Sequence, residues 1–367
     1  MANVLDLRRR IRSVKNTRQI TKAMKMVAAA KLRRAQERAL SSRPYAAMMA
    51  SVLQSLKRRI EIYDPETGEV RHPLLLTRPE KNVLIVVVSG EGGFAGAFNA
   101  NIVKAATSFI TEHTDQQIDV EAIGRKGRDI LRRRYPAAKY LEAQNQEEHE
   151  DSKPVRGERQ ERSNPVELTS DDYRGILHKL SFDRVSELGA EIVSLYTREQ
   201  IDAAYVVYNE FKSVIQQRVV VERILPIVEI GAQDVAHATE MTQGERERAA
   251  QAAASSGINP DTPQSEADAR QAEEEASRFG TAEVDYIYEQ SPKELFSAIL
   301  PRYVATKLYH AMLESTAAEF AARMTAMDSA TNNASDLIDQ YTLAMNRVRQ
   351  AAITKELIEI VSGAAAL

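Results

Sequence analysis

The fold is decided by residues 292–361, which read PKELFSAILPRYVATKLYHAMLESTAAEFAARMTAMDSATNNASDLIDQYTLAMNRVRQAAITKELIEIV. The residues reached by alternating steps of four and three along this stretch, here called stops, are nearly all apolar. They are Leu313, Ala317, Phe320, Met324, Met327, Thr331, Ala334, Ile338, Tyr341, Met345, Val348 and Ala352. The residues between these stops are mostly polar or charged. An apolar period of 3.5 residues predicts one very long helix supercoiled around a second helix.

The start of this helix carries its own signals. Ser291 can cap it, Pro292 suits the first helical position, and Glu294 can complete a capping box. Pro301 lies inside the pattern, and because proline lacks a backbone donor it predicts a kink or a restart there.

The N-terminus supplies a partner of similar length. The same walk gives Val4, Leu7, Ile11, Val14, Arg18, Thr21, Lys25, Ala28, Leu32, Ala35, Ala39, Ser42, Ala46, Met49, Leu53, Leu56 and Ile60. The phase is kept, although three successive stops, Arg18, Thr21 and Lys25, are polar. We therefore expect one antiparallel hairpin with arms of roughly 90 Å at 1.5 Å per residue, with a bend at Pro44.

Between the two arms, residues 75–230 predict an α/β domain. Residues 82–89 form a continuous apolar run typical of a buried parallel strand. Further strands are expected at 117–123, 202–211 and 218–225, and helices at 99–111, 124–134 and 172–197. This alternation predicts a doubly wound sheet. The whole chain is thus predicted to be α/β plus a long antiparallel coiled coil, with N- and C-terminal helices as the shaft and the α/β domain at its foot.

The predicted boundaries follow from this division. They are an N-terminal coiled-coil helix at 1–62, the α/β domain at 75–230, and a foot segment with the C-terminal helix at 282–367. A polar insert at 144–169 and an acidic, Ala- and Glu-rich insert at 231–281 lack the apolar residues needed for a core. We expect both to be surface elaborations, the second with short helices at 244–255 and 266–278.

Composition excludes several kinds of protein. The chain has no cysteine, so it has no disulfide and no thiolate metal site. No apolar run reaches the ~18 residues of a membrane span, and the N-terminus does not resemble a signal peptide. Neither a catalytic triad nor a phosphate-binding loop is present. The six histidines also show no metal-ligand spacing; they are His72, His113, His149, His178, His237 and His310. We expect a non-enzyme without cofactor or metal.

One motif favours a different function. Residues 90–95, GEGGFA, follow the apolar strand and fit Gly-x-Gly-x-x-Ala, with Asp119 and Glu121 on the next predicted strand. Such a loop lets backbone approach a pyrophosphate, which would indicate a nucleotide-binding oxidoreductase with coiled-coil appendages. The alternative is a tightly packed structural turn, which the flanking long helices favour.

The N-terminal arm is strongly basic, with Lys and Arg far outnumbering acids in residues 1–60. Three interpretations remain open for this charge. It is a solvated helix face, a nucleic-acid surface, or a contact for an acidic protein partner. Nucleic acid is disfavoured because no aromatic residues are interleaved with the basic ones.

Both chain ends carry long, specific motifs. They are residues 11–31, IRSVKNTRQITKAMKMVAAAK, with residues 43–45, and residues 346–366, NRVRQAAITKELIEIVSGAAA. These motifs resemble the N-terminal signature and the C-terminus of the gamma subunits of F-type ATP synthases. Residues 89–99 and 286–289 resemble the Gly-rich turn and the foot segment of the same family. The chain departs from the family at 91–95, where an acidic–basic pair and then Gly-Leu-Cys are usual.

The resemblance implies a rotor without catalytic residues. Its coiled coil would stand inside a ring of three alpha and three beta subunits, and its foot would sit on the membrane c ring beside the epsilon subunit. Rotation would then drive the beta sites through their conformational states. The resemblance also implies a peripheral location on the cytoplasmic face of the bacterial inner membrane, with no nucleic acid as partner.

The resemblance further suggests contact residues. Met24, Arg349, Gln350, Thr354 and Glu356 match family positions tied to coupling. We add Lys22 and Lys25, and we expect the polar break in the N-terminal arm to lie near residues 349–356. As a hypothesis, Lys22, Lys25, Arg349 and Lys355 then form a basic collar that attracts acidic loops of the beta subunits. Few large apolar side chains are expected to face outward near the C-terminus. For the c-ring contact the candidates are Tyr286, Tyr288 and Glu289, with a strand of the sheet as the alternative.

Overall fold

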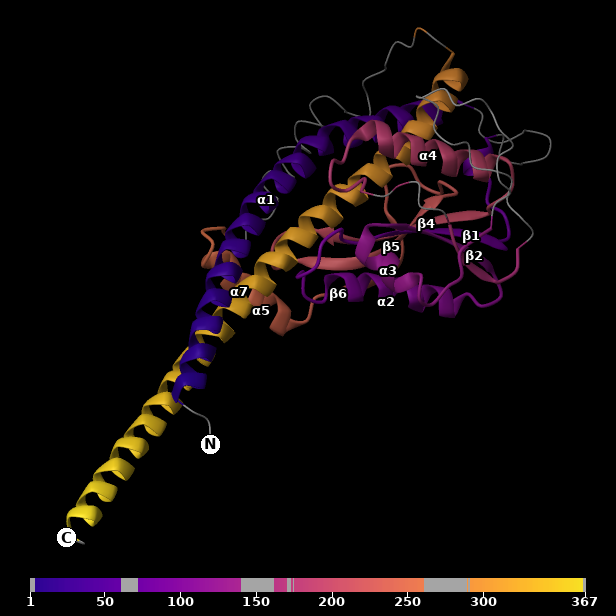
Figure 1. Cartoon of the computed structure of the whole chain (residues 1–367). Helices are drawn as coiled ribbons and strands as arrows, with labels where there is room; N and C mark the ends of the chain where they lie inside the picture. The colour runs from indigo at the N-terminus through magenta and orange to yellow at the C-terminus, as the bar shows by residue number, and fades with distance from the viewer. Residues whose placement is uncertain are drawn as a thin grey trace, which may run out of the picture.

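A computed structural model describes residues 4–60, 72–139, 162–169, 173, 175–260, 289 and 291–365 of the chain. Its main feature is a shaft of two helices, α1 (Val4–Arg59) and α7 (Pro292–Ala365). They lie side by side and antiparallel, so the predicted hairpin is confirmed (Figure 1). At 1.5 Å per residue, the 56 residues of α1 span about 84 Å and the 74 residues of α7 about 111 Å.

The shaft buries most of the predicted apolar stops, whereas Ala352 near the C-terminus is exposed. Leu32, Leu53 and Leu56 of α1 are fully buried, as are Ala317 and Met324 of α7. The polar stops Thr21 and Lys25 are buried as well, with 8% of each residue exposed. The seam therefore continues through the polar break.

The start of α7 is as predicted. The backbone N of Glu294 donates to Ser291 Oγ at 3.3 Å, which caps the first turn. The predicted restart at Pro301 is wrong, because α7 continues through it without interruption. The buried neighbours Leu300 and Val304 hold this part of α7 against the sheet, which compensates for the lost backbone donor. α1 likewise runs through Pro44 and curves over the α/β domain (Figure 1).

The α/β domain holds one six-stranded sheet in the order β3-β2-β1-β4-β5-β6. Its strands are β1 (Asn82–Val88), β2 (Gln117–Ile123), β3 (Val166–Leu168), β4 (Ala203–Phe211), β5 (Gln217–Leu225) and β6 (Asp234–Glu240). The first four are parallel to one another, whereas β5 and β6 are antiparallel to their neighbours. The predicted strands all exist, and the sheet is mixed.

Helices cover both faces of the sheet. Ile85 of β1 packs in a core with α2 (Phe98–Glu112) and α3 (Arg125–Leu131), whereas Val86 packs with α4 (Phe182–Thr197) and the first half of α7. A short 3-10 helix, η1 (Pro73–Leu75), precedes β1. The helix predicted at 172–197 begins only at Phe182, because residues 175–180 form turns around Gly175, whose φ is +68°.

The two inserts are not simple surface elaborations. β3 lies within the first insert and pairs with β2, and β6 lies within the second and pairs with β5. The second insert also holds α5 (Gln243–Ala254), which confirms the helix predicted at 244–255. α5 contacts α7 and buries Ala249, Ala252 and Ala253. The prediction failed because backbone pairing and an alanine face need few large apolar residues. The helix predicted at 266–278 lies outside the described residues.

Candidate functional site

Among the residues that the structure describes, no second helix lies beside the C-terminal tip of the shaft. Because α7 is longer than α1, its last turns extend past the N-terminus (Figure 1). Four of the predicted contact residues lie there, and all four are exposed: Arg349, Gln350, Thr354 and Glu356. The tip therefore presents exposed side chains that other proteins can contact.

The prediction of a tip with few outward apolar side chains is wrong. Ile353, Leu357, Ile358, Ile360 and Val361 are 50–67% exposed. The seam has no second helix at this level, so side chains that would pack against a partner face solvent. A contiguous exposed apolar surface of this kind marks a protein interaction site.

The remaining coupling candidates, Lys22, Met24 and Lys25, lie in the middle of the shaft, where two contacts between α1 and α7 fix their position. Thr331 Oγ1 donates to Thr21 Oγ1 at 2.8 Å, and Lys25 Nζ donates to Asp328 Oδ1 at 2.9 Å. Arg349 follows Thr331 by 18 residues, or about 27 Å of helix. The predicted collar of Lys22, Lys25, Arg349 and Lys355 is therefore not one cluster.

The error has a physical cause, since a heptad pattern does not fix the register of two helices. Lys25 is 8% exposed and is paired within the shaft, so its charge does not face a ring of partners. Lys22 is exposed and Met24 is half-buried at the same level. The candidates thus define two levels of the shaft, one at Lys22 and Met24 and one at residues 349–356.

The Gly-rich loop follows β1 at the carboxyl ends of the parallel strands, beside the point where the strand order reverses between β1 and β4. Open α/β sheets bind ligands in this crevice. Here α7 contacts the loop directly, next to a cavity of about 290 Å³ that Gly92 and Glu319 help to line. Ser315 Oγ donates to the carbonyl of Val88 at 3.1 Å, and Gly92 N donates to Glu319 Oε1 at 3.2 Å. Arg323 Nε donates to the carbonyl of Gly93 at 3.1 Å.

These contacts support the structural-turn interpretation of the motif. Glu319, itself paired with Arg323, places a carboxylate where a dinucleotide would place its pyrophosphate. A Cβ on Gly92 would lie 2.5 Å from an Arg323 nitrogen, so a larger residue here would require the Arg323 side chain to shift. The sequence signal for this role is a charged pair, four residues apart, that flanks the seam residue Phe320.

Titration of the isolated chain with NAD tests this interpretation. We expect no saturable binding, because the Gly92 N–H that would face a pyrophosphate already donates to the Glu319 carboxylate, whose charge repels phosphate. Isothermal titration calorimetry measures the binding, and a dinucleotide-binding dehydrogenase serves as positive control. Stoichiometric binding at micromolar NAD would restore the oxidoreductase alternative.

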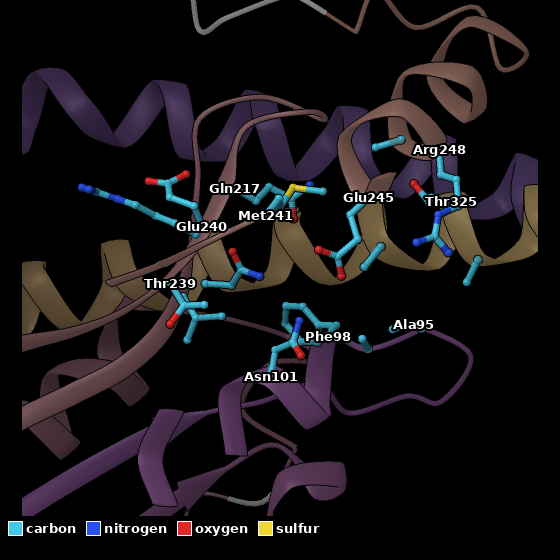
Figure 2. A pocket seen from close by; sticks show the side chains of 18 of the residues that line it. Ala95, Phe98, Asn101, Gln217, Thr239, Glu240, Met241, Glu245, Arg248 and Thr325 are labelled. Carbon is cyan, nitrogen blue, oxygen red and sulfur yellow. The ribbon is translucent and has the colours of Figure 1, made fainter. Parts of the chain in front are cut away.

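A cavity of about 390 Å³ lies between α2, the β5–β6 pair, α5 and α7 (Figure 2). In Figure 2, Glu245 and Arg248 of α5 face Phe98 and Asn101 of α2 across it, and Thr325 lies on α7. Its lining includes opposite charges and many small residues. Among the residues that the structure describes, no group of three or more His, Asp or Glu could hold a metal ion.

A buried polar network fastens the sheet to the shaft. Lys307 Nζ of α7 donates to Glu222 Oε1 of β5 at 3.0 Å and to the carbonyl of Ala232 at 3.1 Å. Tyr208 of β4 donates to the other oxygen of Glu222 at 3.0 Å. Burial, together with the nearby Glu222 charge, raises the pKa of Tyr208 well above its usual value, so its hydroxyl remains a donor. Force on the sheet therefore reaches α7 through direct contacts.

The foot segment is described only in part. Tyr286 and Tyr288 lie outside the described residues, and Glu289 is exposed. Within the described ranges, no helix combines the length and apolar character needed to span a bilayer. The c-ring contact therefore stays a prediction.

Comparisons with known proteins agree with this architecture. Residues 3–367 match the family described as ATP synthase. The chain is 40% identical over 366 residues to the ATP synthase gamma chain of Solibacter usitatus, covering 100% of this chain and 99% of that one. It is 37% identical over 369 residues to the gamma chain of Anaeromyxobacter sp. strain Fw109-5, covering 100% of both.

A solved chain gives a more distant likeness. In the cryo-EM structure of the Euglena gracilis mitochondrial ATP synthase, a chain with 18% sequence identity has a TM-score of 0.47, covering 99% of this chain and 94% of that one. The curated relatives decide the assignment, because their identity extends over the full chain. This chain belongs to the ATP synthase gamma chain family.

Proposed function

We propose that the chain is the rotor of an ATP synthase, whose shaft turns inside a ring of three alpha and three beta subunits. The observation that carries this proposal is the exposed tip of α7, which in the described part of the chain is a single helix at the end of a shaft about 111 Å long. A tip of this shape fits the axis of a ring. Family membership supplies the complex in which such a ring exists.

The geometry accounts for coupling without a catalytic residue. Each shaft helix is continuous, and Lys307 joins the sheet to α7 through Glu222. Torque applied to the α/β domain therefore turns the shaft as one body. Because the sheet lies on one side of the shaft, the body is asymmetric (Figure 1). The surrounding beta subunits then meet a different face of the shaft at each angle.

Two levels of the shaft are proposed to meet the beta subunits. Lys22 and Met24 form the mid-shaft level. The tip level is formed by Arg349, Gln350, Thr354 and Glu356. An exposed ion pair contributes only about 0–1 kcal/mol. Torque therefore comes from shape and from many contacts, including the apolar tip.

The other end is proposed to sit on the membrane c ring with the epsilon subunit alongside. Tyr286, Tyr288 and Glu289 are the candidate contacts with the c ring. The chain would then be peripheral on the cytoplasmic face of the bacterial inner membrane, reaching the membrane only through the complex.

Assembly tests the proposed partners. The tagged chain is co-expressed with the alpha and beta subunits and purified under native conditions. We expect a complex with three copies of each larger subunit and one of this chain, and ATPase activity that the isolated chain lacks. Purification of this chain alone, free of both subunits, would contradict the proposal.

Met24→Lys tests the mid-shaft level of contact with the beta subunits. A new ammonium group at this half-buried position adds a misplaced charge between shaft and ring, so fewer protons should be pumped per ATP hydrolysed. Proton pumping and ATP hydrolysis are measured together in membrane vesicles. Met24→Leu, which keeps an apolar side chain of similar volume, should preserve the ratio. An unchanged ratio in Met24→Lys would remove this residue from the coupling contact.

A further inference from the structure

The second insert has no assigned role, yet it contacts both helices of the shaft. α5 follows β6 after two residues and lies against α7 (Figure 1). Ala252 and Ala253 are fully buried in this contact. On its other side, the cavity of Figure 2 separates α5 from α2. α5 is thus held mainly by the shaft.

The turn after α5 reaches the second shaft helix. Lys25 Nζ of α1 donates to Ser255 Oγ at 3.0 Å, and Arg33 Nη2 donates to the carbonyl of Gly257 at 3.1 Å. Lys25 and Arg33 are eight residues apart, so the turn follows α1 for about two helical turns. Gly257, with φ +66°, directs Ile258 back onto the apolar core, where it is 8% exposed.

Ser255 also completes the polar break in the seam. Its hydroxyl donates to Asp328 Oδ1 at 3.0 Å, the same oxygen that accepts from Lys25 at 2.9 Å. Asn332 donates to the other oxygen of Asp328 at 3.4 Å. Lys25 and Asp328 thus meet inside the shaft at a point where three segments of the chain converge.

A buried polar pair in a coiled coil has one well-attested use, which is to fix register. Apolar stops repeat every 3.5 residues, so a shift of one helix past the other by one turn keeps most apolar contacts. The same shift would separate Lys25 from Asp328 and leave each buried charge without its counter-charge. Only the observed register pairs the two charges.

We propose that α5 and the turn 255–258 form a bracket that fixes the register of α1 against α7, with Lys25, Asp328 and Ser255 as its lock. Because β6 belongs to the sheet and leads directly into α5, the bracket ties the sheet to both shaft helices at once. This role concerns the shaft alone and does not depend on the rotor function.

Disulfide trapping in the isolated full-length chain tests the bracket. The chain has no cysteine, so two introduced cysteines form one defined pair. Thr21→Cys with Thr331→Cys reports the observed register, in which the two hydroxyls are 2.8 Å apart. Thr21→Cys with Ser335→Cys reports a register shifted by one turn. The measured quantity is the ratio of the two cross-linking rates.

Two changes should lower this ratio. The first is Ala252→Glu, which places a carboxylate at a fully buried position and displaces α5. Its matched control is Ala254→Glu, the same change at an exposed position, which should leave the ratio unchanged. Lys25→Met with Asp328→Leu replaces the lock by apolar residues and preserves folding. For both Ala252→Glu and the double variant we expect the ratio to fall about tenfold, the change that 1.4 kcal/mol of lost register preference produces.

Each other outcome overturns part of the proposal. If Ala252→Glu and Ala254→Glu give the same ratio, α5 is not part of the bracket. If the double variant keeps the ratio of the parent chain, Lys25 and Asp328 are not the lock. Circular dichroism of every variant shows whether both helices are retained, and the double variant decides the question if Ala252→Glu does not fold.

Discussion

Asp328→Ala is expected to lower the free energy of unfolding of the chain by about 3–5 kcal/mol, the usual cost of removing one partner of a buried ion pair. Asp328 is 5% exposed and its carboxylate accepts from Lys25 and Ser255. Without it, the Lys25 ammonium remains at an 8% exposed position with no counter-charge. Guanidinium denaturation monitored by circular dichroism measures the loss.

The matched control is Asp336→Ala, on the same helix two turns away, where the carboxylate is exposed. It should change the free energy of unfolding by less than about 0.5 kcal/mol. Equal losses in the two variants would show that Lys25 finds another partner and that the polar break is not held by Asp328.

Gly124→Ala is expected to destabilise the α/β domain by about 3–5 kcal/mol, from backbone strain and from overpacking. Gly124 follows β2 with φ +90° and ψ 131°, a conformation that L-residues rarely adopt. A Cβ there would lie 2.1 Å from the carbonyl oxygen of Ser89, which is main chain and cannot rotate away. The ends of β1 and β2 would have to separate.

Gly244→Ala is the matched control for this substitution. No atom lies within 4 Å of its Cβ position, and it occupies the first turn of α5. We expect an effect between neutral and about 1 kcal/mol of stabilisation, since alanine restricts the unfolded chain. A loss in Gly124→Ala no larger than in this control would mean that the β1–β2 edge yields easily.

The long elements were predictable because their signals are local and repeated. The apolar stops of residues 292–361 and 4–60 identify both shaft helices and the faces that they bury. Strands β1, β2, β4 and β5 were predictable from apolar runs bounded by turns. Each of these patterns indicates which face of one helix or strand is buried against the rest of the protein.

The register of the shaft could not be predicted, because a repeating seam is satisfied in several registers. It depends on Lys25 and Asp328, which are 303 residues apart and meet only in the fold. The collar predicted from Arg349 and Lys25 failed for that reason. Because α1 is shorter than α7, the tip of α7 is exposed. The heptad pattern of each helix, taken separately, does not predict this difference in extent.

Elements built on backbone pairing and small residues were missed for another reason. β6 has five exposed residues among its seven, so its sequence lacks a strand's apolar alternation. α5 packs with alanines alone. The Gly-rich loop shows the opposite error, because its local pattern indicates a dinucleotide while its Gly92 N–H donates to Glu319, more than 200 residues away. The candidate contact residues came from family resemblance, and the structure contributes their positions.

The most direct test of the rotor account is observation of single complexes. The complex with alpha and beta subunits is fixed to glass through the ring, and a bead is attached to one cysteine introduced at the exposed Asp115 of the α/β domain. On addition of ATP we predict stepwise rotation of the bead in one direction about the shaft axis. Sustained ATP hydrolysis with a bead that keeps a fixed angle would contradict the account.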